Sequence, residues 1–116
     1  MGAFLMQLKM KGVIIMRIGT TPTFTFHLPF SSSLISKIRV IFHQNNRIVL
    51  KKNKSDLEID AEKINLTLAE HETFMFEPGA NVTIQAHILT TENQALTSNE
   101  YVVSAIRCLD DGVITT

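Results

Sequence analysis

Several features that mark small secreted, metal-binding or nucleic-acid-binding proteins are missing from this sequence. Its 116 residues include one cysteine and no tryptophan, and 11 acidic side chains balance 11 basic ones. A lone cysteine provides neither an intrachain disulfide nor a zinc site built from cysteine pairs. The balanced charge argues against nucleic-acid binding, which requires a basic surface that neutralises phosphates. No apolar run approaches the ~18 residues of a membrane-spanning helix.

What the sequence does contain is a regular alternation of apolar and polar residues, which is the pattern of a half-buried strand. In residues 21–30 the apolar side chains face one side, and the polar side chains of Thr23, Thr25 and His27 face the other. The same pattern predicts further strands over residues 37–44, 47–52, 56–60, 63–69, 81–90 and 100–109.

Turn signals separate these predicted strands. The two asparagines at 45–46 tolerate the positive φ of a tight hairpin, and residues 91–95 predict a second hairpin loop. Residues 69–79 interrupt the alternation, and their first half predicts a single helical turn. We expect Phe74 and Phe76 to close the core at this corner.

The number and spacing of these segments predict the fold class. About seven strands with frequent turns indicate an all-β domain, a seven-stranded antiparallel β-sandwich with Ig-like or Greek-key connections and one short helical corner. A small barrel is the alternative. The inward face of the last strand is ambiguous, because Val103 and Ala105 oppose an equally apolar set, Val102, Ile106 and Cys108.

The first residues of the chain do not follow the order of a signal peptide. In residues 1–15 the lysines lie between short apolar runs, and no small-residue cleavage site follows. The codons of Lys-Gly-Val upstream of Met16 can contain AAGGAGT, a bacterial ribosome-binding sequence. We therefore hypothesise a start at Met16 and a non-native leader or flexible segment before it; the alternative is an N-terminal strand that packs on the domain. Residues 16–109 are then one sandwich domain, and 110–116 a tail.

No constellation of residues in the sequence specifies a chemistry. The histidines at 27, 43 and 87 fall on outward faces of predicted strands, and solvent exposure explains them. Residues 31–33, with His71 and its neighbouring glutamates, contain the residue types of a hydrolytic triad, but the nucleophile-elbow motif G-x-S-x-G is missing. We expect no catalytic, metal-binding or cofactor-binding residue, and a protein that is not an enzyme.

From Met16 to about Val113 the chain resembles small proteins encoded in the tail or structural modules of phages and prophages of low-GC Gram-positive bacteria. The segments that carry the resemblance are MRIGTTPTFTFHLPF, IRVIFHQNNRIVLKK, INLTLAEHETFMF and NVTIQAHILTTENQALTSNEYVVSAIRCL. Their layout is also similar to the N-terminal β-sandwich domain of phage baseplate upper proteins. These segments are patterning motifs and contain no catalytic residue of the family.

The resemblance implies a non-enzymatic structural or assembly protein of a phage or prophage tail. Its partners would be copies of itself, as a homo-oligomer, or a larger tail protein, with no nucleic acid, membrane or cofactor. Its place would be the bacterial cytoplasm during assembly and then the virion. The first predicted sandwich strand and the last one are the expected edges, with Thr23, Thr25, His27 and Tyr101 as possible interface residues. The alternative is a small ligand- or carbohydrate-binding module, although a sugar platform needs more exposed aromatic residues than this chain has.

Overall fold

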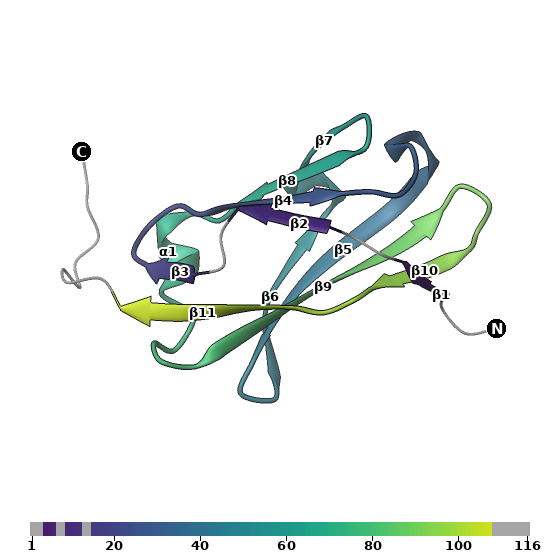
Figure 1. Ribbon diagram of the computed structural model, residues 1–116. Coiled ribbons are helices and arrows are strands. Elements are labelled where there is room, and N and C mark those ends of the chain that lie inside the picture. Colours follow the sequence, from purple (N-terminus) through teal and green to yellow (C-terminus); the bar gives the residue numbers. More distant parts are fainter. Residues whose placement is uncertain (1–3, 7–8, 13–14, 108–116) are drawn as a thin grey trace.

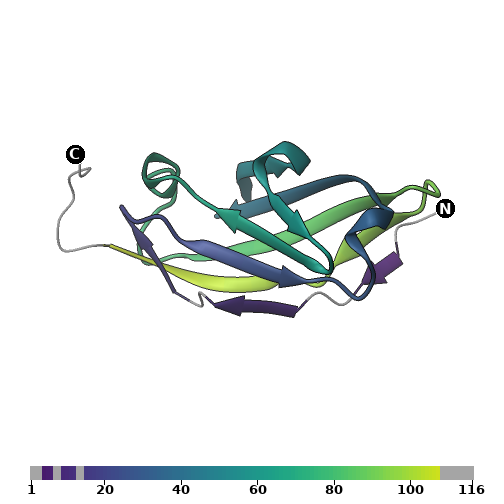
Figure 2. The same ribbon diagram turned by 90° about the horizontal axis from the view of Figure 1, so that it is seen from above.

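The computed structural model describes residues 4–6, 9–12 and 15–107 of the chain. In this part of the chain two β-sheets pack face to face as a sandwich (Figures 1 and 2). Sheet A contains β1 (Phe4–Met6), β3 (Ile15–Ile18), β5 (Ile35–Gln44), β6 (Arg47–Asn53), β9 (Asn81–Thr90), β10 (Ala95–Ser98) and β11 (Tyr101–Arg107). Sheet B contains β2 (Lys9–Gly12), β4 (Thr23–His27), β7 (Glu58–Asp60) and β8 (Lys63–Thr67). The short helical turns are η1 (Ser32–Leu34), η2 (Lys54–Asp56) and α1 (Glu70–Thr73).

The long strand β9 lies at the centre of sheet A. On one side it pairs with β5, which pairs in turn with β6. On the other side β10 and β11 follow one another along β9. Next to them lie two short N-terminal strands in parallel orientation, β1 beside β10 and β3 beside β11. The outer face of sheet A is therefore a broad surface built from strands that are distant in sequence.

Sheet B has the strand order β2-β4-β8-β7, and its described pairs are antiparallel. Together the two sheets show the strand distribution of Ig-like sandwiches, in which strands A, B, E and D face strands C, F and G. The prediction of an all-β sandwich with one short helical corner is confirmed. The strand number is larger than expected because the N-terminal segment contributes three short strands and residues 95–98, at the end of the predicted hairpin loop, form β10.

The core between the sheets follows the predicted alternation. Phe24 and Phe42 approach edge-on across it, with ring centroids 5.6 Å apart. Val103 and Ala105 are buried, whereas Val102 is 56% exposed, so the inward face of β11 is the one that carries Val103 and Ala105. The other fully buried large side chains are those of Met16, Phe26, Val40, Gln44, Ile64, Leu66, Leu68, Val82 and Ile84.

The corner around α1 closes one end of this core. Phe76 is buried there, and its ring centroid lies 5.9 Å from that of Phe42, as the sequence predicted. Phe74 was expected in the same role, but this prediction is wrong because the side chain is 37% exposed. Its ring lies over Gly19, where an added Cβ would meet the Phe74 Cζ at 3.3 Å. Phe74 therefore covers the turn after β3 rather than the core.

The predicted sheet edges are also corrected. Strand β4 lies between β2 and β8, and β11 lies between β9 and β3. Neither strand is an edge, because residues 9–12 and 15–18 pair with backbone groups that would otherwise be free. In the described part of the chain the edges are β6 and the N-terminal strands in sheet A, and β7 and β2 in sheet B.

The N-terminal segment crosses between the two sheets. β1 pairs in sheet A, β2 pairs with β4 in sheet B, and β3 returns to sheet A. This is the arrangement of an N-terminal strand that packs on the domain, the alternative named for residues 1–15. Translation from Met16 stays a prediction about the gene. The predicted tail at 110–116 lies outside the described residues. No described helix has the length and apolar character to cross a membrane.

Candidate binding surface

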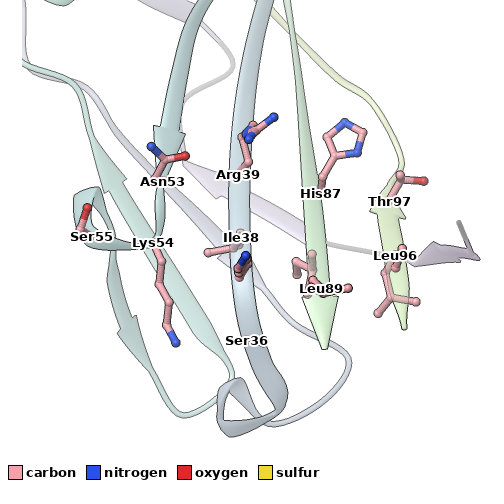
Figure 3. Close-up of a pocket in the computed structure, with 13 residues that line it drawn as sticks. Ser36, Ile38, Arg39, Asn53, Lys54, Ser55, His87, Leu89, Leu96 and Thr97 are labelled. Atoms are coloured by element: carbon pink, nitrogen blue, oxygen red, sulfur yellow. The ribbon is translucent and has the colours of Figure 1, made fainter. Parts of the chain in front are cut away.

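The outer face of sheet A carries an open groove of about 530 Å³. It crosses β5, β9 and β10 and is bounded on one side by η2 (Figure 3). The residues that line it are Ser36, Lys37, Ile38, Arg39, Asn53, Lys54, Ser55, His87, Ile88, Leu89, Ala95, Leu96 and Thr97.

A row of polar side chains runs across the groove from strand to strand. Arg39 lies opposite Asn53 on one side and opposite His87 on the other, and His87 lies opposite Thr97. Directly paired residues on one sheet face hold their Cβ atoms about 5 Å apart. Figure 3 shows these four side chains side by side on four adjacent strands. Their alignment comes from strand register rather than from closeness in sequence.

The groove is basic. Lys37, Arg39 and Lys54 contribute three positive charges, and no carboxylate of the described chain lines it. Lys37 and Arg39 are exposed, and neither forms an ion pair within the described residues. The Nζ of Lys54 donates to the backbone oxygen of Ile35 at 3.2 Å, which holds this ammonium group beside the start of β5. An anionic group in the groove would face cations with no competing acid.

A second feature of the same face is a row that combines apolar and polar residues. Ile48 lies opposite His43, His43 opposite Thr83, and Thr83 opposite Val102. Ile48 is 47% exposed and Val102 56% exposed, at the two ends of the row. We call these four residues the apolar row. His43 and Thr83 separate the two aliphatic side chains, so the row offers a partner two exposed apolar positions rather than one continuous apolar patch.

The residues predicted as possible interface lie elsewhere and are not brought together as one site. Thr23 and Thr25 hydrogen-bond to their neighbours on β8, Thr67 at 2.8 Å and Asn65 at 2.7 Å. These bonds tie the outer face of sheet B together.

His27 is half-buried and lies opposite Lys63 in β8. Tyr101 is half-buried in the other sheet, and its ring packs 6.3 Å from that of Phe26. Tyr101 thus contributes to the core. An interface role for these side chains stays a prediction.

The structure separates the groups of the considered hydrolytic triad. The backbone of Ser32 bonds to Ala61 before β8, whereas His71 lies in α1 beyond the other end of β8. No group of three or more histidine, cysteine or carboxylate side chains is arranged to hold a metal ion in the described residues. The fold therefore does not bring the serines at 31–33 close to His71, as a hydrolytic triad would require.

The carboxylate of Glu72 has a shifted pKa, and it joins α1 to β6. Glu72 in α1 forms an ion pair with Lys52 of β6 and accepts a hydrogen bond from the Ala69 N–H at 2.8 Å. Burial disfavours its charged form, but the Lys52 ammonium and the Ala69 N–H outweigh burial, so the pKa of Glu72 lies below its ordinary value. The pair links the edge of sheet A to the corner.

No protein-family model matches the chain, and no curated protein matches it either.

Sequence reasoning missed the groove. Its lining residues belong to separate predicted strands and to the segments between them, which nothing in the sequence brings together. The only available signal was the alternation of apolar and polar residues, which correctly placed His87 on an outward face.

Proposed function

We propose that this chain is a non-enzymatic structural protein of a phage or prophage tail and that it acts through protein–protein contacts. The observation that carries the proposal is the apolar row on the outer face of sheet A. Its terminal residues, Ile48 and Val102, are about half exposed, although both are aliphatic. Covering such side chains with a partner contributes favourable free energy of about 25 cal/mol per Å² of apolar area.

The second support is the resemblance of four segments of the sequence to tail-module proteins and to the N-terminal domain of baseplate upper proteins. The Ig-like sandwich is compatible with that resemblance, although one fold can serve many functions. In this proposal the partners are other copies of the chain or a larger tail protein. The chain is made in the bacterial cytoplasm and ends in the particle.

The test is tryptic mass spectrometry of particles purified after prophage induction in a strain that carries the gene. The peptide VIFHQNNR, residues 40–47, reports the protein. The proposal expects this peptide in purified particles at a constant ratio to the major tail protein across independent preparations. Finding the peptide only in the soluble lysate, and not in intact particles, overturns the proposal.

A further inference from the structure

The basic groove on sheet A has an acidic counterpart elsewhere in the same chain. Strand β7 and its flanks carry Asp56, Glu58, Asp60 and Glu62, and all four are exposed. β7 is an edge of sheet B in the described chain. None of the four forms an ion pair within the described residues. The net charge of zero therefore conceals a basic groove and an acidic segment, which adjoin at η2.

The chemistry of the groove narrows the class of occupant. No phenylalanine or tyrosine lines it, so among its lining residues the imidazole of His87 is the one aromatic ring on which a nucleobase or a sugar ring could stack. Its floor is partly aliphatic, with the half-buried Leu89, and its rim is cationic. A peptide segment that combines carboxylates with a backbone able to hydrogen-bond fits this lining. The charge of β7 and its flanks is complementary to it.

We propose that the groove of one copy binds the acidic β7 segment, residues 56–62, of a second copy. This inference rests on the proposed function, since it identifies one partner and one surface for the protein contacts. In the bound state Lys37 and Arg39 face carboxylates of β7, and the free edge of that strand lies against the groove. Attraction between the two surfaces weakens with salt, because exposed charges are screened over about 10 Å at 0.1 M ionic strength.

The placement of the two surfaces bears on the kind of assembly. The groove opens on the outer face of sheet A, whereas Glu58 and Asp60 pair across from Asn65 and Lys63 in sheet B. The acidic segment begins at Asp56, the last residue of η2, which bounds the groove. Two copies can therefore make the contact twice, in a closed two-fold dimer, or repeat it from copy to copy in rings or open chains.

The test is sedimentation velocity at low ionic strength with two charge-reversed variants. The groove variant carries Lys37→Glu and Arg39→Glu, and the β7 variant carries Glu58→Lys and Asp60→Lys. Lys54 and Asp56 are left unchanged because each makes a hydrogen bond to the backbone within its own chain. The matched control carries Arg17→Glu and Arg47→Glu, two exposed residues that do not line the groove. Thermal melting confirms that each variant folds.

The wild type and the control are expected to self-associate in a concentration- and salt-dependent manner. Each reversed variant is expected to associate about tenfold or more weakly by itself. An equimolar mixture of the groove and β7 variants is expected to regain association, because reversed charges then face each other. A monomeric wild type, or a mixture that stays monomeric while the wild type associates, overturns the inference. A chain that is monomeric in solution but present in purified particles contradicts this inference and leaves the proposed function standing.

Discussion

Gln44 and Glu77 exchange two hydrogen bonds across the corner of the sandwich. The Gln44 Oε1 accepts from the Glu77 N–H at 2.7 Å, and the Gln44 Nε2 donates to the Glu77 oxygen at 2.8 Å. The same Nε2 lies 3.2 Å from the oxygen of Ala80. Gln44 is 1% exposed, so one buried amide at the end of β5 satisfies three backbone groups of the loop that leads into β9.

Replacing Gln44 with Ala is expected to lower the free energy of unfolding by about 2–3 kcal/mol, because it leaves buried backbone groups without partners. Gln44→Glu is expected to be at least as harmful, since a carboxylate cannot donate to the two carbonyl oxygens. The matched control is Gln85→Ala, which removes a single bond to Ser98 from a half-buried side chain. Urea denaturation measures all three. Equal, small losses for Gln44→Ala and Gln85→Ala would contradict this role.

Thr73 is expected to hold the turn after β3 in place. Its buried Oγ1 accepts the Gly19 N–H at 2.8 Å and donates to the Glu70 oxygen at 2.7 Å. Thr73→Val keeps the shape and removes the acceptor, so the Gly19 amide is expected to exchange its hydrogen faster. Thr73→Ser keeps the hydroxyl and should preserve slow exchange. Amide exchange followed by NMR provides the readout, and identical Gly19 rates in the two variants would argue against the bond.

The Lys52–Glu72 pair is expected to make stability depend on acid pH. The folded-state pKa of Glu72 lies below the ordinary value of 4.5, so folding favours the ionised carboxylate. The stabilisation is therefore fully present above pH 4.5 and is lost as the pH falls through the folded-state pKa.

The measurement is the difference in unfolding free energy between wild type and Lys52→Met, followed from neutral to acid pH. This difference is expected to shrink below pH 4.5. Lys51→Met is the control. Lys51 is the neighbouring residue of β6, is exposed, pairs with Ile41 in β5 and forms no ion pair with Glu72. A difference that stays constant through the acid range would show that the pair does not stabilise the fold.

A chain that starts at Met16 is expected to fold but to be less stable. It retains Met16, which is fully buried, and nearly all of the pairing between β3 and β11. It loses the four paired positions between β2 and β4 and the three between β1 and β10, which is expected to cost about 2–4 kcal/mol. Chemical denaturation of the two lengths measures this loss. Equal stabilities would mean that β1 and β2 contribute nothing.

The start site itself is tested by mass spectrometry of the protein from its natural gene. The peptide GVIIMR, residues 12–17, is produced only if translation begins upstream of Met16. The late-start hypothesis expects this peptide to be missing beside good coverage of the remaining chain, and its detection rejects the hypothesis.

The sequence predicted the fold well because each buried position repeats every second residue. The alternation around Phe24, Val40 and Ile84 identified strands and inward faces correctly. It failed where apolar residues occupy both faces, as at Val102 and Val103, because only the opposing sheet decides which one is buried.

The candidate surface was much less accessible to sequence reasoning. Asn53, Arg39, His87 and Thr97 form one row only because four strands pair in a particular register. The edges were mispredicted for the same reason, since nothing local in residues 9–12 indicates that they pair with β4. The polar row and the sheet edges both depend on pairing between strands that are distant in sequence, so they can be recognised only once the sheet is assembled.

The measurement that tests the account most directly is competitive incorporation into particles. Cells that produce the particle express the wild type together with a variant carrying Ile48→Glu and Val102→Glu, and mass spectrometry quantifies both in purified particles. The control pair is Leu34→Glu and Met75→Glu, which have comparable exposure but lie outside the apolar row. The account predicts that wild type exceeds the Ile48/Val102 variant by about tenfold or more, as the loss of buried aliphatic contacts implies, and that the control is incorporated like the wild type. Equal incorporation of all three, or particles that contain none of them, would contradict it.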